Sequence, residues 1–269
     1  MSDLNINNLG VLNKLGSYIN TVSEVSSEYV ISSYLIRNIN RINNIGVYDI
    51  VEDCYVSISA VRRFCNDIGY NNFSDLKSSL NDVIYPSNIH QRSFTNIDFY
   101  RRVLEQELIN KLDTVNKLLD DKTVINLCQL IESYDNVYFL CANNTSGNII
   151  RFQQELFSVN KITHIISSNF ELEFANRIHS SNRSLIIVVS VSGLFADSIN
   201  NIISSSNNHY KLLVTSNSKE KFVKEYNKIV NLSDEPIDDD NYGIISKYGV
   251  TLFFDLLSEQ YIYMSRNKI

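Results

Sequence analysis

Apolar residues recur at helical spacing in the first third of the chain and gather into short continuous runs in its second half. From Val22 to about Ile84 every segment with a clear pattern is helical, and no alternating run typical of a strand occurs. Tyr85–Asn88 breaks this pattern, and a polar, aperiodic stretch follows up to Asn96. These features predict an all-α domain over residues 1–85 and a linker over residues 86–97.

The rest of the chain, residues 98–269, predicts an α/β domain. A long amphipathic helix over Asp98–Leu119 and a short helix over Thr123–Ser133 come first. Five short apolar runs then alternate with helical segments, which is typical of a parallel sheet buried on both faces and flanked by helices. The predicted strands are Val137–Leu140, Ile162–Ile166, Leu185–Ser190, Lys211–Thr215 and Ile229–Leu232, and the predicted helices are Gly147–Val159, Phe170–Ile178, Ala196–Ser205, Lys219–Tyr226 and Gly243–Met264.

Composition narrows the class of protein. The net charge is −6, from 24 basic and 30 acidic residues, so bulk charge gives no argument for binding nucleic acid or a membrane, although a small basic face can sit on an acidic body. No apolar run approaches the roughly 18 residues of a membrane span, and no signal peptide is visible, so we expect a cytoplasmic protein. The four cysteines (Cys54, Cys65, Cys128 and Cys141) lack metal-ligand spacing and are expected to be reduced thiols.

Two short helices in the N-terminal part fit a helix-turn-helix. Val47–Cys54 predicts the first helix, and Ser59–Ile68 predicts the second, capped by Ser57. The outward face of the second helix then carries Ser57, Ser59, Arg62 and Arg63, which suit the phosphate oxygens and base edges of a DNA major groove. The alternative, a three-helix packing domain with solvated arginines, is left open by this pattern alone.

The stretch VSISAVRRFCNDIGYNNFSDLK resembles the helix-turn-helix of the RpiR/MurR family of bacterial transcriptional regulators. The residues that match the family pattern are Val56, Ser57, Ser59, Val61, Arg63, Phe64, Gly69, Tyr70, Phe73 and Lys77, with Ile68 in place of the usual Leu. The resemblance implies that double-stranded operator DNA is a partner. It also implies that the DNA-binding residues are Ser57, Ser59, Arg62, Arg63 and Lys77.

The same resemblance implies a sugar isomerase (SIS) domain after the linker. The sequence SVSG, Ser190–Gly193, follows an apolar strand and is similar to the Ser-x-Ser-Gly turns that hold sugar phosphates in such domains. Hydroxyl groups and N–H groups at a helix start bind phosphate, and open α/β sheets bind ligands at the carboxyl ends of their strands. A second loop places Thr145 and Ser146 after the first strand. The implied ligand-binding residues are Thr145, Ser146, Ser190, Ser192 and Gly193.

This chain departs from the SIS pattern at three positions. Cys141 and Asn143 stand where glycines are usual, and Phe195 replaces a phosphate-binding threonine. SVSG also fits a plain strand-to-helix turn with a capping serine. Two other functions therefore stay open: a sugar-phosphate isomerase, and a domain that only dimerises. No catalytic residue, metal site or cofactor is expected, because the four histidines lie outside the candidate loops (His90, His164, His179 and His209).

Together these features predict a DNA-binding transcriptional regulator of sugar or amino-sugar metabolism genes, controlled by a phosphorylated sugar. A single helix-turn-helix makes few contacts with DNA, so two-fold assemblies are usual. The amphipathic helices Asp98–Leu119 and Gly243–Met264 carry more apolar surface than one small domain needs. We therefore expect a homodimer or homotetramer formed through the C-terminal domain, and no membrane partner.

Overall fold

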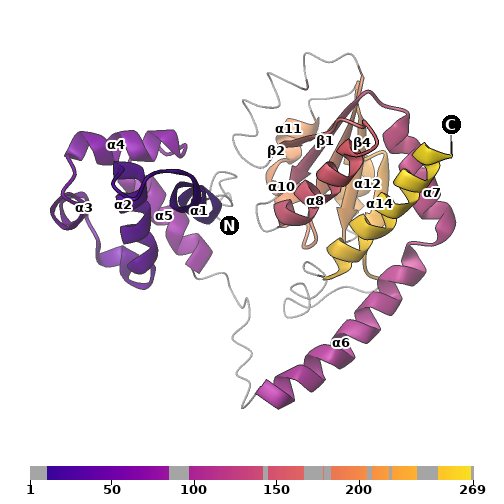
Figure 1. Ribbon diagram of the computed structural model, residues 1–269, viewed down its shortest axis with the longest axis horizontal. Helices are drawn as coiled ribbons and strands as arrows, with labels where there is room; N and C mark the ends of the chain where they lie inside the picture. The colour runs from indigo at the N-terminus through magenta and orange to yellow at the C-terminus, as the bar shows by residue number, and fades with distance from the viewer. Residues whose placement is uncertain are drawn as a thin grey trace. The chain divides into compact units, whose positions relative to one another are not determined.

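The described part of the chain forms two compact units, one within Met1–Ser87 and the other within Asn88–Ile269 (Figure 1). The computed structural model describes residues 11–84, 97–141, 145–166, 178, 183–204, 208–217, 220–234 and 248–267. The proposed linker over residues 86–97 lies almost wholly outside the described residues, as does the predicted helix Phe170–Ile178.

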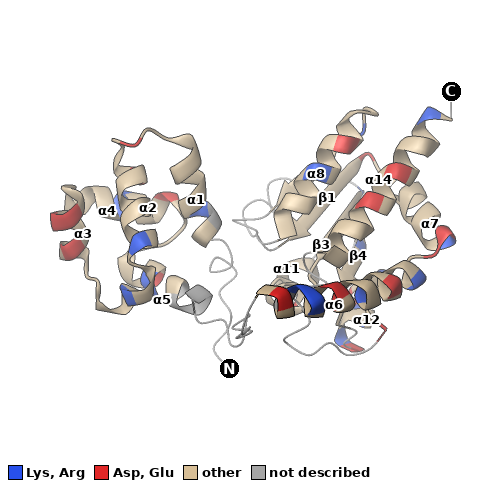
Figure 2. Ribbon diagram, turned by 60° about the horizontal axis from the view of Figure 1, so that its bottom comes forward, with Lys and Arg blue, Asp and Glu red and all other residues tan. Residues whose placement is uncertain are grey.

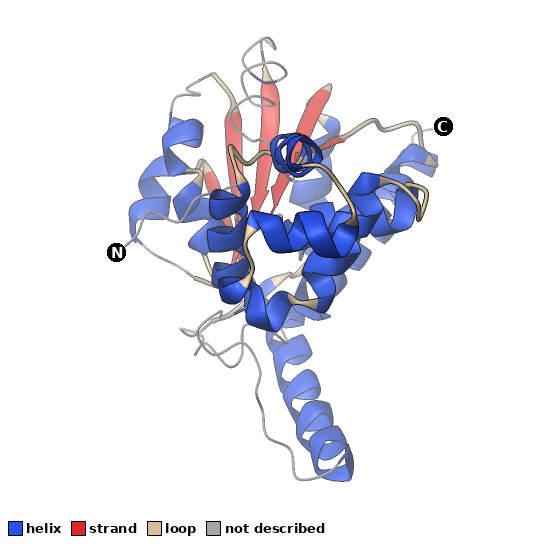
Figure 3. Ribbon diagram, turned by 90° about the vertical axis from the view of Figure 1, so that its left-hand side faces the viewer, coloured by secondary structure: helices blue, strands red, loops and turns tan. Residues whose placement is uncertain are grey.

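The first unit is built from helices alone among its described residues; every strand belongs to the second unit (Figure 3). Its elements are α1 (Val11–Thr21), α2 (Ser27–Arg37), the 3-10 helix η2 (Ile39–Asn44), α3 (Val47–Cys54), α4 (Ile58–Asp67) and α5 (Phe73–Ile84). Their apolar faces meet in one core that includes the fully buried Ile31, Leu35, Ile50, Phe64 and Leu76. The predicted all-α character of this unit is confirmed.

The second unit contains a five-stranded parallel sheet in the order β2-β1-β3-β4-β5. Its strands are β1 (Asn136–Cys141), β2 (His164–Ile166), β3 (Ser184–Val189), β4 (Tyr210–Thr215) and β5 (Lys228–Asn231), and its helices are α6 (Ile97–Leu118), α7 (Asp121–Glu132), α8 (Ser146–Phe157), α10 (Leu194–Ser198), α11 (Asn200–Ser204), α12 (Glu220–Glu225) and α14 (Val250–Arg266). The predicted parallel sheet flanked by helices is confirmed. No helix in the described ranges is long and apolar enough to cross a bilayer.

The sheet is buried on both faces. Alternate strand residues such as Phe139, Ile187 and Leu212 pack into one core with α7, α8 and α14. Figure 1 shows α10, α11 and α12 across the sheet from α8 and α14, and all six residues of β3 are buried. This double cover explains why the strands read as continuous apolar runs rather than alternating ones.

One predicted helix differs from the structure. The segment Ala196–Ser205 was expected to form a single helix, but it forms the two short helices α10 and α11. Between them Ile199 has φ −98° and ψ 5°, outside the α-helical region, so the first helix ends at Ser198. The apolar pattern does not show this break because Ile199 is itself buried and keeps the helical spacing.

Candidate DNA-binding and ligand-binding sites

The helix-turn-helix is formed by α3, the turn Tyr55–Val56 and α4. The Ser57 hydroxyl accepts a hydrogen bond from the Ala60 N–H at 3.1 Å and so caps α4. Val61 and Phe64 are buried against the rest of the unit, as their spacing predicts.

Four of the five predicted DNA-binding residues lie together on the exposed side of α4. Ser57, Ser59, Arg62 and Arg63 are all exposed, and the two serine hydroxyls lie 2.8 Å apart. Within the described residues neither guanidinium forms an ion pair. The arginines are therefore available to an anionic partner such as DNA.

Lys77, the fifth predicted DNA-binding residue, is engaged inside the unit. Its ammonium group donates hydrogen bonds to the carbonyl oxygens of Asn43 at 3.0 Å and Ile45 at 2.9 Å. These bonds attach α5 to the end of η2, since the carbonyls there have lost their helical partners. The structure thus gives Lys77 a packing role that a local motif does not reveal.

Acidic residues gather on α3 rather than on α4 (Figure 2). Asp49, Glu52 and Asp53 are all exposed. Asp49 also accepts a hydrogen bond from the Gly46 N–H at 2.7 Å, which satisfies a backbone donor at the start of the helix. The negative charge of this part of the sequence therefore belongs to the first helix of the pair, and α4 presents the positive charge.

Sequence reasoning did not single out Tyr55, the first residue of the turn. Its backbone lies in the left-handed region, with φ 54° and ψ 40°, and its side chain is 95% exposed. Glycine is the residue that adopts this conformation without cost. The sequence gives one hint of this left-handed conformation, namely that Tyr55 stands in the turn between the two helices.

The predicted ligand-binding residues lie in loops at one edge of the sheet. Strands β1, β3 and β4 are parallel neighbours, and the last residue pairs are Cys141 with Val189 and Val189 with Val214. The loops that follow these strands therefore meet at the carboxyl edge. Thr145 and Ser146 stand there at the start of α8, and Ser190–Gly193 connects β3 to α10.

The hydroxyl of Ser190 is used inside the protein. It accepts a hydrogen bond from the Ala196 N–H at 3.0 Å, and Ser190 is only 4% exposed. Phe195, which replaces the family's threonine, is 3% exposed and packs in the core. This geometry is that of a capped strand-to-helix turn. Ser192 is half-buried and so more exposed than Ser190, and its hydroxyl accepts a hydrogen bond from the Leu194 N–H at 3.4 Å.

The loop after β4 holds the SVSG loop in place through hydrogen bonds. The Asn217 side-chain amide donates to the Ser192 carbonyl oxygen at 2.9 Å, and the Ser216 N–H donates to the Val191 carbonyl oxygen at 2.9 Å. Gly193 has φ +79°, and a Cβ placed there would lie 3.2 Å from the Phe222 ring. The turn therefore favours glycine at position 193, both for its left-handed backbone and for the limited space beside Phe222.

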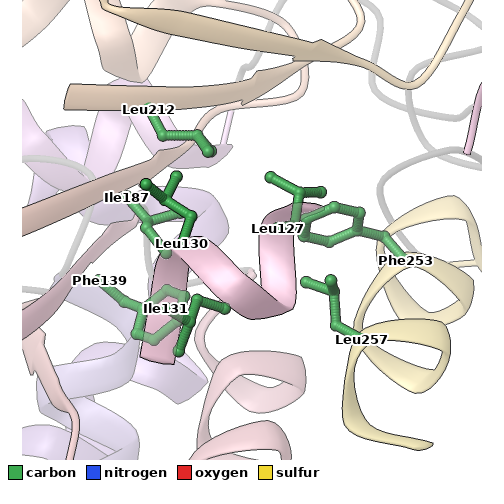
Figure 4. A pocket seen from close by; sticks show the side chains of 8 residues that line it. All are labelled: Leu127, Leu130, Ile131, Phe139, Ile187, Leu212, Phe253 and Leu257. Atoms are coloured by element: carbon green, nitrogen blue, oxygen red, sulfur yellow. The ribbon is translucent and has the colours of Figure 1, made fainter. Parts of the chain in front are cut away.

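A small cavity in the α/β core is a different feature from this polar edge (Figure 4). It lies between α7, α14 and the sheet and is lined by Leu127, Leu130, Ile131, Phe139, Ile187, Leu212, Phe253 and Leu257. With no hydrogen-bonding side chain in its wall, it does not suit a sugar phosphate.

Comparison with known proteins gives a family match for the first unit and one curated relative. Residues 9–87 match the helix-turn-helix domain of the rpiR family. The HTH-type transcriptional regulator GlvR of Bacillus subtilis is 21% identical over 168 residues, which cover 62% of this chain and 61% of GlvR. The chain thus aligns with less than two thirds of that relative's length.

The fold is also found in solved structures. The Vibrio vulnificus NanR protein, complexed with ManNAc-6P, matches with a TM-score of 0.52 at 17% identity. The match covers 96% of this chain and 93% of the NanR chain. The sugar isomerase domain of an RpiR transcription factor from Sphaerobacter thermophilus matches with a TM-score of 0.48 at 12% identity. That match covers 60% of this chain and 90% of the solved domain. The predicted order, a helix-turn-helix domain followed by an α/β domain with a parallel sheet, is confirmed, and residues 9–87 of this chain match the helix-turn-helix domain of the rpiR family.

Proposed function

We propose that this chain is a transcriptional regulator that binds operator DNA through α4 and is controlled by a phosphorylated sugar bound to its α/β domain. The observation that carries the proposal is the exposed face of α4, with Ser57, Ser59, Arg62 and Arg63, inside a domain that matches the rpiR family. We propose residues 1–85 as the DNA-binding domain, 86–97 as a linker and 98–269 as the effector domain.

The DNA-binding face is tested by removing its arginines. Arg62→Ala and Arg63→Ala should each weaken binding to the DNA upstream of the gene by about 1–3 kcal/mol where the arginine contacts a base. A mobility-shift titration at fixed salt measures the loss. Arg37→Ala, which removes the same charge from an exposed position on α2, serves as the control. Unchanged binding in both α4 variants would exclude this face.

The effector site is supported by the polar edge of the sheet. Ser192, Gly193, Thr145 and Ser146 belong to neighbouring loops at the starts of α10 and α8, where hydroxyl and N–H donors suit a phosphate group. The solved structure of NanR, which shares the fold, is of a complex with ManNAc-6P. A hexose or amino-sugar phosphate is therefore our proposed ligand class.

A thermal-shift screen over hexose and amino-sugar phosphates tests the effector. A ligand at one hundred times its dissociation constant should stabilise the fold by about 2.7 kcal/mol, which raises the melting temperature by roughly 5–11 °C. Ser192→Ala should reduce the shift, whereas Ser133→Ala, an exposed serine at the end of α7, should leave it intact. Equal shifts in wild type and Ser192→Ala would place the ligand elsewhere.

A second function, a domain that dimerises without a ligand, is favoured by one observation. Ser190 is only 4% exposed and its hydroxyl accepts a hydrogen bond from the Ala196 N–H, so the loop gives a phosphate little access to this serine. If no sugar phosphate shifts the melting temperature of the wild type, this alternative replaces the effector proposal. We assign no catalytic role to His164, the described histidine on the edge strand, which stacks on Tyr138 with ring centres 5.1 Å apart.

We further propose that the second unit forms the homodimer or homotetramer. Its helix α6 buries Val115 near its end, but Ile97, Phe99 and Ile109 are 65%, 48% and 58% exposed. A second copy of the chain that packs against these side chains would remove their apolar surface from water. Light scattering of the full chain at micromolar concentration should give at least about twice the 30.9 kDa of one chain. A single-chain mass would contradict the proposal.

A further inference from the structure

The first residue of α4 carries an apolar side chain on a face that is otherwise polar. Ile58 is 52% exposed, whereas Val61 and Phe64 of the same helix are 2% and 1% exposed. Its neighbours Ser57 and Ser59 are both exposed. Packing within the domain therefore does not account for an isoleucine at this position.

Ile58 shares its side of the helix with an arginine of the DNA-binding face. Ile58 and Arg62 are four residues apart, so they are neighbours on the helix surface, about 6 Å apart along its axis. The serines beside Ile58 are joined by a 2.8 Å hydrogen bond and one of them caps the helix. Ile58 thus lies at the capped end of α4, one turn before Arg62.

The DNA major groove offers one apolar group at the edges of its unmodified bases, the C5-methyl group of thymine. We propose that Ile58 contacts a thymine methyl group and makes α4 selective for an A·T base pair. This inference rests on the proposed function, in which α4 enters the major groove. It adds a base preference that the serines and arginines do not supply, because a hydroxyl or guanidinium group gains nothing from a methyl group.

The position of the thymine follows from the helix geometry. A separation of about 6 Å along α4 corresponds to less than two base-pair steps of 3.4 Å. The contacted thymine should therefore lie within about two base pairs of the base or phosphate that Arg62 contacts. The preferred operator should show a thymine at one fixed position in each half-site.

The experiment removes only the methyl group. The full chain first selects its preferred duplex from a random-sequence library, and each thymine of that duplex is then replaced singly by deoxyuridine. We expect one replacement in each half-site to weaken wild-type binding about fourfold, the factor that corresponds to one buried methyl group. The other replacements should have little effect.

Variants of Ile58 assign the effect to its side chain. Ile58→Ser should bind the thymine and uracil duplexes equally, whereas Ile58→Val, which keeps a branched apolar side chain, should retain part of the discrimination. Ile36→Ser, at a 39% exposed isoleucine on α2, should discriminate as the wild type does. Each variant is compared at the same salt concentration, because phosphate contacts depend on it.

Two outcomes would overturn the inference. Either the wild type binds every uracil duplex as tightly as its thymine counterpart, or Ile58→Ser still discriminates between them. Failure of the proposed function gives a different result, since the wild type would then select no sequence, and Arg62→Ala and Arg63→Ala would bind DNA as the wild type does.

Discussion

At the residue scale, the turn of the helix-turn-helix holds Tyr55 in a left-handed conformation, in which the Cβ of an L-residue crowds the next carbonyl oxygen. The side chain is 95% exposed, so no buried contact offsets this cost within the domain. The helix-turn-helix unit therefore carries a local energetic penalty at the residue that leads into α4.

Replacing this tyrosine should stabilise the unit. The left-handed conformation costs about 1–2 kcal/mol for a residue with a Cβ, more than the additional chain entropy that glycine loses, so Tyr55→Gly should raise the free energy of unfolding by about 0.5–1 kcal/mol. Tyr48→Gly, at an exposed tyrosine within α3, should lower it by a similar amount. Urea unfolding of both variants measures this; a loss of stability in Tyr55→Gly would contradict the strain.

A second pair of residues lies on α2. The Ser32 hydroxyl is fully buried and has no hydrogen-bond partner in the described part of the unit, whereas Ser26 caps the helix by accepting from the Tyr29 N–H at 3.2 Å. Ser32→Ala should stabilise the fold by about 1 kcal/mol, and Ser26→Ala should destabilise it by about 1 kcal/mol. Thermal unfolding should show midpoints that move in opposite directions, and a lower midpoint for Ser32→Ala would mean that its hydroxyl is bonded.

At the scale of elements, the start of α10 depends on its neighbours in space. Gly193 has φ +79°, and Phe222 of α12 and Asn217 occupy the space where a side chain would begin. The SVSG loop is thus held by contacts with a segment that follows it by more than twenty residues. Its geometry depends on how the segment β3–α10 packs against the segment β4–α12.

Gly193→Ala should therefore destabilise the α/β unit by about 1–3 kcal/mol, through the left-handed backbone and the 3.2 Å approach to Phe222. Gly147→Ala is the matched control, because no atom lies within 4 Å of the added Cβ and the residue is in the first turn of α8. The control should be neutral or slightly stabilising. Equal melting temperatures for the two variants would show that the turn adapts.

The elements themselves were largely predictable, since local patterns determine them. The predicted helix Val47–Cys54 has the observed bounds, because Ile50 and Cys54 recur at helical spacing and a turn follows. The features that escaped prediction depend on distant partners: the bonds from Lys77 to carbonyls more than thirty residues away, and the contact of Phe222 with Gly193. The left-handed Tyr55 escaped because sequence patterns assign that conformation to glycine.

At the scale of the whole molecule, both units bury free thiols. Burial raises the pKa of Cys54 and Cys65 to about 11 and that of Cys128 and Cys141 to about 12, from an ordinary value of 9.0. Unfolded thiols ionise first as the pH rises, so the unfolded state binds fewer protons than the folded state above pH 9. Burial lowers the pKa of Lys14, and this shift makes the free energy of unfolding rise with pH, but it involves one group against four thiols.

The free energy of unfolding should therefore fall between pH 8 and 9.5, below the range in which phenols ionise. Each thiol contributes a slope of at most about 1.4 kcal/mol per pH unit. Urea unfolding across this range measures the slope, and Cys54→Ala should reduce it by removing one thiol. A free energy that stays constant up to pH 9.5 would show that the thiols ionise in the folded protein.

The α/β unit cannot complete its core until helix α14, near the end of the chain, has been synthesised. It packs against α7 and α8, and it contributes Phe253, Phe254, Leu257 and Tyr261 to the same core as the sheet. At about 5–20 residues per second, roughly 9–36 s of translation separate the end of the helix-turn-helix unit from residue 266. During that time the helical unit can fold, whereas the face of the sheet that α7, α8 and α14 share lacks the cover of α14. A ribosome that stalls before residue 250 would leave a folded helix-turn-helix unit attached to an incompletely covered apolar sheet, a form prone to aggregation.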